Sequence, residues 1–193
     1  PQGSDAAKGL LRFAKGKPLG EDGTRWLAIH LANCFGQDKC SLEDRVLWAY
    51  LNTEKIIYAS TNPTTDDYWR SASKPFQFLA ACFEWARMTA MGADGANMVS
   101  HIPIAQDGSC NALQHHAAMA GCKKSAENVN IIPSDSPVDL YSLVLQNLRD
   151  KLSLSEDPVD KQWLSRLGRD LVKRPCMTTG YGVTPSGVRK QLE

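Results

Sequence analysis

Long apolar runs are missing from this sequence. None of its segments approaches the roughly 20 consecutive apolar residues that a membrane-spanning helix needs, and no signal peptide is recognisable at its start. Internal repeats and low-complexity tracts are also absent. These absences predict a soluble protein that does not associate with a membrane.

Closely spaced cysteine pairs are lacking as well. The six cysteines, at positions 34, 40, 82, 110, 122 and 176, include no Cys-x-x-Cys pair. We therefore expect six reduced thiols and a reducing compartment. A zinc site built from Cys110, His115, His116 and Cys122 is the alternative, although the spacing of these residues matches no standard zinc pattern.

A strong net charge is the third feature that this sequence lacks. Its 22 Lys and Arg residues nearly balance 21 Asp and Glu residues, so the net charge of the whole chain does not indicate a nucleic-acid-binding protein. The charge is unevenly placed, however, because seven basic residues face two acidic ones between Lys161 and Glu193. This basic C-terminal segment indicates a local anion site. A solvated helix face is the alternative.

Helix signals are abundant and strand signals are few. A short buried strand is expected at 102–106, and an extended segment at 129–132. The pattern predicts an α+β fold that is predominantly helical. Helices are expected over residues 6–14, 24–33, 41–59, 75–91, 109–119, 135–152 and 164–179, and from residues 157 and 185 onward.

One segment places a carboxylate at the end of the apolar strand. Asp107 is followed at once by Gly108, where the chain must turn and a ligand can approach the backbone closely. A rigidly held carboxylate is a good ligand for magnesium, which prefers oxygen donors. The alternative is an Asp that only caps the following helix. The segment reads Pro103-Ile104-Ala105-Gln106-Asp107-Gly108-Ser109-Cys110-Asn111-Ala112-Leu113-Gln114-His115.

A second segment places cations one helical turn apart. Arg169 and Lys173 share a helix face, so they can bind one polyanion together, and Met177 continues that face. Tyr181 follows between two glycines, where an aromatic ring can stack on a base. The alternatives are a solvated basic face, a core Met and a Tyr that packs against the core. The segment reads Arg169-x3-Lys173-x3-Met177-x3-Tyr181-Gly182.

These two segments resemble the signature motifs of the single-subunit, bacteriophage-type DNA-dependent RNA polymerases, a family with phage, mitochondrial and chloroplast members. The first motif agrees over consecutive positions, and the second keeps Arg, Lys, Met and Tyr at the family's spacing. Weaker likeness runs nearly end to end. Two positions depart from the family pattern, because Ala112 stands where many members have Gly and Cys176 where a larger aliphatic residue is usual.

The resemblance implies two-metal nucleotidyl transfer with Mg2+ as the cofactor. Asp107 would be a catalytic residue and a metal ligand, with the backbone carbonyl of Gly108 as a further ligand. Lys173 would be the second catalytic residue. Gln114 and His115 would give structural support to the metal-bearing segment.

The same resemblance assigns nucleotide-binding roles to the second motif. Arg169 and Lys173 would bind the triphosphate, and Met177 would pack beside the nucleotide or the template base. Tyr181 would help to select ribonucleotides over deoxyribonucleotides, and Gly182 would let the template approach the backbone.

The resemblance also predicts the domain organisation of a right-hand polymerase. Residues 1–134 would be part of the palm, with a helical insertion at about 21–97, and residues 135–193 would start the fingers with the nucleotide-binding helix. The chain would thus begin within a polymerase and end soon after the second motif.

Two-metal transfer needs at least two carboxylates, and the family takes its second one from a His-Asp motif. No His is followed by Asp in this sequence. We therefore expect the isolated chain to be inactive, with the remainder of the polymerase or a companion chain supplying the second Asp. A non-catalytic nucleic-acid-binding or subunit module that keeps the polymerase fold is the alternative.

The expected partners are a DNA template, an RNA product and ribonucleoside triphosphates. The compartment would be the host cytoplasm for a phage enzyme or the organelle matrix for a mitochondrial one.

Overall fold

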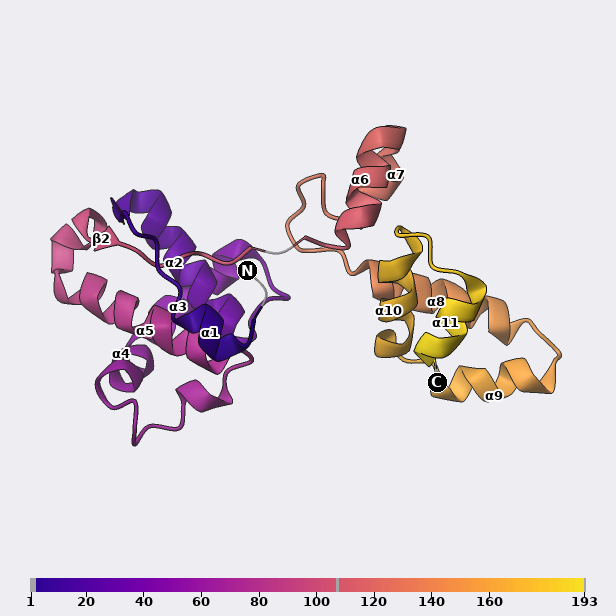
Figure 1. Ribbon diagram of the computed structural model, residues 1–193, viewed down its shortest axis with the longest axis horizontal. Helices are drawn as coiled ribbons and strands as arrows, with labels where there is room; N and C mark the ends of the chain where they lie inside the picture. The colour runs from indigo at the N-terminus through magenta and orange to yellow at the C-terminus, as the bar shows by residue number, and fades with distance from the viewer. Residues whose placement is uncertain (1–2, 107, 193) are drawn as a thin grey trace. The chain divides into compact units, whose positions relative to one another are not determined.

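The computed structural model describes residues 3–106 and 108–192, and its chain divides into two compact units between Gln106 and Asp107. Helices dominate both units (Figure 1), so the predicted α+β, predominantly helical class is confirmed. Within the described ranges, no helix combines the length and the apolar character that a membrane crossing requires. All six cysteines are free thiols. The assignment to palm, insertion and fingers stays a prediction.

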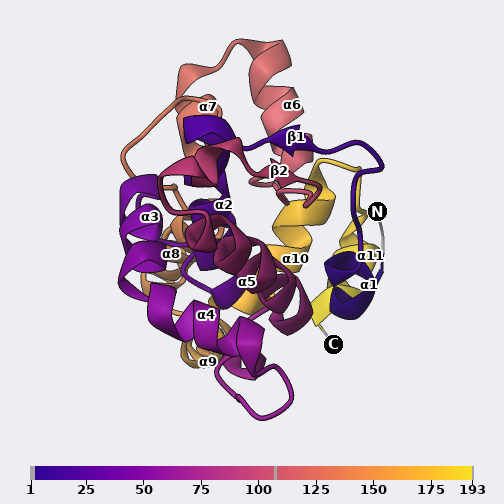
Figure 2. The ribbon, with the colours of Figure 1, turned by 90° about the vertical axis from the view of Figure 1, so that its left-hand side faces the viewer.

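Over its described residues, 3–106, the first unit is a helical bundle with one short β-ladder (Figure 2). Strand β1 (Lys17–Pro18) pairs antiparallel with β2 (Val99–Ser100), with Lys17 opposite Ser100. The helices are α1 (Asp5–Gly9), α2 (Gly20–Phe35), α3 (Leu42–Leu51), α4 (Thr53–Thr61) and α5 (Pro75–Ala90), with 3-10 turns η1 (Trp69–Ser71) and η2 (Gly92–Asn97).

Helix α5 organises the core of this unit. Pro75 occupies the first helical turn, where its missing N–H is not needed. Phe78, Ala81 and Trp85 then follow at helical spacing and are fully or almost fully buried. They belong to one hydrophobic cluster with Leu27 of α2 and Ile56 of α4. Helices α1, α2 and α4 all pack against α5.

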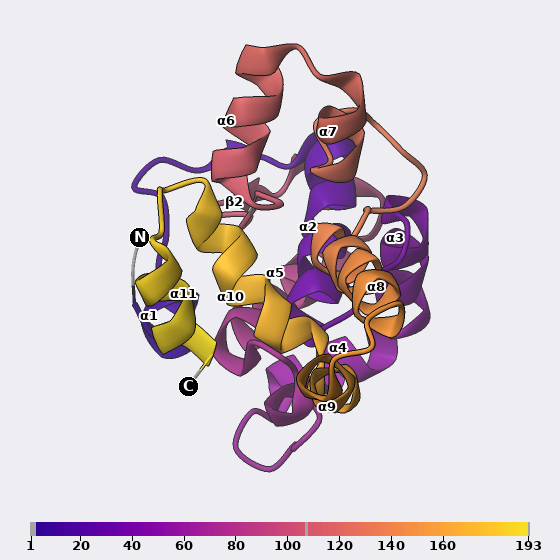
Figure 3. The ribbon, with the colours of Figure 1, turned by 90° about the vertical axis from the view of Figure 1, so that its right-hand side faces the viewer.

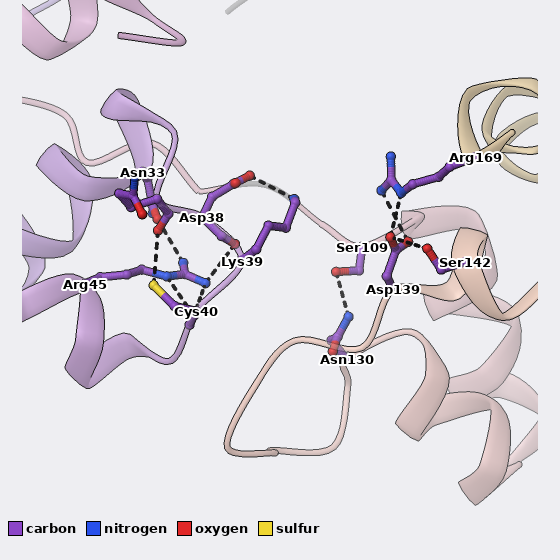
Figure 4. Close-up of polar contacts among 11 residues, drawn as sticks. Asn33, Asp38, Lys39, Cys40, Arg45, Ser109, Asn130, Asp139, Ser142 and Arg169 are labelled. Atoms are coloured by element: carbon purple, nitrogen blue, oxygen red, sulfur yellow. Dashed lines mark hydrogen bonds and ion pairs between the residues drawn. The ribbon is translucent and has the colours of Figure 1, made fainter. Parts of the chain in front are cut away.

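A buried arginine holds the loop between α2 and α3 by hydrogen bonds. The guanidinium of Arg45 donates to the carbonyl oxygens of Asp38 and Cys40 and to the side-chain oxygen of Asn33 (Figure 4). The buried guanidinium needs such acceptors, because a buried donor without a partner costs free energy.

Three expectations for this unit were wrong. The helix expected over 6–14 is α1, which already ends at Gly9. The helix expected over 41–59 is two helices, α3 and α4, separated at Asn52, whose φ of −103° and ψ of 12° leave the helical region. The side-chain amide and the backbone N–H of Asn52 both donate to the carbonyl of Trp48 at the end of α3. The strand expected at 102–106 is irregular backbone, because Pro103 has no N–H to give to a ladder. Ile102 is nevertheless buried.

The second unit, residues 107–193, consists of helices and connecting loops, with no strand among its described residues (Figure 3). It has two small apolar clusters, one centred on Ala117, Ala126 and Val129 and the other on Leu145, Leu167 and Val172. Its helices are α6 (Asn111–Ala120), α7 (Lys123–Asn128), α8 (Leu140–Ser153), α9 (Pro158–Arg166), α10 (Arg169–Thr179) and α11 (Pro185–Leu192).

The segment expected to be extended at 129–132 begins with a turn, because Val129 has a ψ of 17° and Asn130 a φ of +58°. Two helix boundaries also differ from expectation here. The helix expected over 164–179 is interrupted at Leu167 and Gly168, which are both extended, because Leu167 turns into the core and is 7% exposed. Arg169 is therefore the first residue of α10. The helix expected from residue 135 starts only at Leu140, where the side chain of Asp139 accepts the N–H of Tyr141 and caps the helix.

Candidate functional site

Helix α10 presents the second motif on its outer side. Val172 is buried against the cluster that it shares with α8, and α10 and α8 pack together. Lys173 and Met177 are exposed, whereas Arg169 is half-buried at the start of the helix. Because Arg169 and Lys173 are one turn apart on a continuous helix, they lie on the same face, as the spacing predicts.

The two motifs meet where α10 ends and α6 begins. A Cβ atom added to Gly180 would lie 2.6 Å from the Cβ of Ala112, so only glycine fits at this contact without a shift. Nearby, the thiol of Cys110 lies 4.0 Å from the carbonyl oxygen of Cys176. Small residues on both sides therefore let the backbones of the two motifs approach closely.

Tyr181 joins this junction through its hydroxyl group. The Tyr181 hydroxyl donates to the side-chain oxygen of Asn111 at 2.5 Å, which links the second motif to the first. The Tyr181 side chain is 68% exposed, so the alternative of a core tyrosine does not hold. Gly182 follows with a φ of +77°, a backbone conformation that favours glycine.

Arg169 is held by two residues at the start of α8. Its Nε and Nη2 atoms donate to the two carboxylate oxygens of Asp139 at 2.5 and 3.2 Å (Figure 4). Its Cζ atom lies 5.2 Å from the ring centroid of Tyr141. The hydrogen bond from Arg169, followed by one from Ser142, lowers the pKa of Asp139 to about 2. Asp139 is therefore a carboxylate at neutral pH.

Asn130 connects the first motif to this pair. Its amide donates to the hydroxyl oxygen of Ser109 at 3.0 Å (Figure 4). The amide also donates to the carbonyl of Val138 at 2.8 Å, and the side-chain oxygen of Asn130 accepts the N–H of Val138 at 2.7 Å. Asn130 has a φ of +58°, which asparagine tolerates better than most residues. It therefore fixes the chain immediately before Asp139.

Asp107, the proposed metal ligand, lies outside the residues that the structure describes. A Cβ added to its neighbour Gly108 would lie 3.0 Å from the side-chain oxygen of Gln114. The Gln114 amide donates to the carbonyl of Val129 at 2.7 Å, whereas His115 is exposed on α6. Gln114 is thus a structural link within the unit.

The metal prediction has no support from side-chain geometry. Among the described residues, no group of three or more His, Cys, Asp or Glu side chains could hold a metal ion, the zinc alternative included. The described residues alone therefore do not fit a two-magnesium site, and any such site needs Asp107 and donors beyond them.

Sequence reasoning missed Asn111, Asn130 and Asp139. Asn130 and Asp139 carry weak local signals, since asparagine favours left-handed backbone and aspartate favours helix starts. No local pattern indicates that Asp139 pairs with Arg169, 30 positions later, or that Asn111 pairs with Tyr181, 70 positions later.

Comparison with known proteins identifies the family. A family model described as DNA-dependent RNA polymerase matches residues 17–193. The chain is 45% identical to the mitochondrial DNA-directed RNA polymerase of Neurospora crassa, an alignment that covers 98% of the chain and 14% of that protein. It is 34% identical to the DNA-directed RNA polymerase of Enterobacteria phage T3, over 100% of the chain and 24% of that protein.

This chain belongs to the DNA-dependent RNA polymerase family, in its single-subunit, phage-type branch. The resemblance drawn from the two motifs is thereby confirmed. The chain spans between 14% and 24% of the length of these relatives.

The close contact at the junction of the two motifs leads to a testable prediction about packing. Gly180→Ala should destabilise the chain by about 1–3 kcal/mol, because the new methyl group overpacks the contact with Ala112. Ala112→Gly should cost only about 0.5–1 kcal/mol, since it weakens a helix. Urea unfolding of both variants and of the double variant measures their coupling.

In the double variant, the Cβ of Ala112 is gone and its next nearest atom lies 3.5 Å from the new methyl group, an ordinary contact. The double variant should therefore be more stable than the sum of the single effects predicts. Strict additivity would contradict a direct contact between the motifs.

Proposed function

We propose that this chain is the segment of a DNA-directed RNA polymerase that binds the incoming ribonucleoside triphosphate and carries one of the metal-holding carboxylates. The complete polymerase would copy a DNA template into RNA and release pyrophosphate. The main support is the junction at which the Tyr181 hydroxyl meets Asn111, because it joins the second motif to the part of the first motif that belongs to the second unit.

Arg169 and Lys173 would bind the triphosphate. Both are cationic and lie on one face of α10, and charge-assisted hydrogen bonds to phosphate are stronger than neutral ones. Arginine can in addition bind two phosphate oxygens at once. Arg174 points about 100° away from Lys173 around the helix, so it would contribute less.

Tyr181 would read the sugar of the nucleotide. Its exposed ring can stack on a base, and its hydroxyl can hydrogen-bond a ribose 2′-hydroxyl, directly or through water. Met177, which is 43% exposed, would pack beside the nucleotide or template base. Gly182 would let nucleic acid approach the backbone.

Asp107 would hold Mg2+, with the carbonyl of Gly108 as a further ligand. Magnesium, when bound, neutralises charge on the phosphates. A second carboxylate would come from the remainder of the polymerase or a companion chain. The other partners would be the DNA template and the RNA product.

The relatives support an organelle matrix as the compartment, since the polymerases of Neurospora crassa and Schizosaccharomyces pombe, 45% and 41% identical, are both mitochondrial. The cytoplasm of an infected host is the alternative, on the weaker likeness to the phage T3 enzyme.

Removal of the Asp107 charge tests the catalytic role. In the complete polymerase, Asp107→Asn should leave the fold nearly intact and reduce nucleotide addition by several orders of magnitude, because each 1.4 kcal/mol of lost transition-state stabilisation is about a tenfold change in rate. Single-nucleotide extension of an RNA primer measures this. If the variant kept more than about a tenth of the wild-type rate, the non-catalytic module would be the better interpretation of the segment.

A series of three alanine variants tests the triphosphate contact. In the complete polymerase, Arg169→Ala and Lys173→Ala should each raise the KM for the incoming nucleotide by roughly tenfold or more, because each removes a charge-assisted hydrogen bond. Arg174→Ala is the matched control and should have a smaller effect. A larger defect for Arg174→Ala than for Lys173→Ala would show that another face of α10 binds the nucleotide.

A further inference from the structure

The pair between Arg169 and Asp139 leaves part of the guanidinium group available. An arginine has five N–H donors, and Asp139 accepts from two nitrogen atoms, Nε and Nη2. The Arg169 side chain is 36% exposed, so the group is not sealed inside the unit. Arg169 can therefore keep its bond to Asp139 and still donate to an anion.

The carboxylate of Asp139 is itself fixed in place. One of its oxygens accepts the backbone N–H of Tyr141 at 3.1 Å, and the other accepts the hydroxyl of Ser142 at 2.9 Å. The backbone N–H and carbonyl of Val138, the residue before it, both form hydrogen bonds with the side chain of Asn130. A rigid acceptor thus orients the longer and more flexible side chain of Arg169.

The ring of Tyr141 adds a second constraint. It lies 5.2 Å from the Cζ atom of Arg169, within the range of a cation–π contact. Asp139 and Tyr141 both come from the start of α8, whereas Arg169 starts α10. The start of one helix therefore fixes the direction of a cation on another.

Two opposite effects follow from this arrangement. The negative charge of Asp139 weakens the attraction between Arg169 and a phosphate group, but both side chains are about one-third exposed, so water screens that effect. Ordering of the Arg169 side chain before the ligand arrives favours binding, since less rotamer freedom is then lost. Because water screens the charge of Asp139 at this exposure, we expect the gain from ordering Arg169 to exceed the loss of attraction to phosphate.

We propose that Asp139 is a positioning residue that orients Arg169 toward the triphosphate of the incoming nucleotide. The inference rests on the proposed function, because it requires that Arg169 binds that triphosphate. Asp139 does not touch the nucleotide and acts through Arg169.

The test is the variant Asp139→Asn in the complete polymerase, measured by the KM and kcat of single-nucleotide addition. Asparagine is as good a helix cap as aspartate, so α8 should still start at Leu140. We expect the KM for the incoming ribonucleotide to rise about three- to tenfold with kcat nearly unchanged, because ordering of Arg169 is lost.

Asp157→Asn is the matched control. Asp157 caps α9 in the same way, since its side chain accepts the N–H of Val159 at 2.8 Å. Asp157→Asn should leave KM unchanged. In an Arg169→Ala background, Asp139→Asn should add little, because no guanidinium remains to be oriented.

Three results would overturn the inference. The KM could stay unchanged in Asp139→Asn, it could fall because Asp139 competes with phosphate for Arg169, or it could rise equally in Asp157→Asn. If one of these results is found while Arg169→Ala and Lys173→Ala still raise KM, the positioning role of Asp139 is wrong and the proposed function stands. If neither alanine variant raises KM, the proposed function fails first.

Discussion

The close contact between Gly180 and Ala112 is the constraint on which the candidate site depends. It lets the end of α10 lie against the start of α6, so that two motifs far apart in the sequence form one surface. The hydrogen bond from Tyr181 to Asn111 joins the residues next to this contact. Gly180, which has no side chain, accommodates the methyl group of Ala112.

Polar links carry much of the local order in the second unit. Its two apolar clusters are small and hold mostly Ala, Val and Leu, so they fix the helices less tightly than a large core would. Hydrogen bonds of Asn130 and Asp139 add to the order that these small clusters provide. Asn130 links the first motif to the segment before α8, and Asp139 links the start of α8 to Arg169. The triphosphate-binding proposal depends on this chain of contacts.

Local patterns predicted part of this structure and missed the rest for physical reasons. Pro75 and Pro158 marked helix starts correctly, since proline fits the first turn of a helix. The strand expected at 102–106 failed because apolar character indicates burial as well as pairing, and Pro103 cannot join a ladder. The spacing of Arg169 and Lys173 was sufficient to predict that they share a helix face. Their long-range contacts could not be predicted, because residues that pair across a long stretch of chain leave no periodic signal in the sequence.

A double-mutant cycle at the junction tests the central claim, that the two motifs form a single nucleotide site. Tyr181→Phe, Asn111→Ala and the double variant would be compared in the complete polymerase by their preference for ribonucleotides over deoxyribonucleotides. Loss of a hydrogen bond of about 1–2 kcal/mol should lower this preference roughly five- to thirtyfold in Tyr181→Phe. Asn111→Ala should lower it partly, and the double variant should match Tyr181→Phe alone, because both changes affect the same hydroxyl group. An unchanged preference in Tyr181→Phe, or two effects that multiply independently, would contradict a single site.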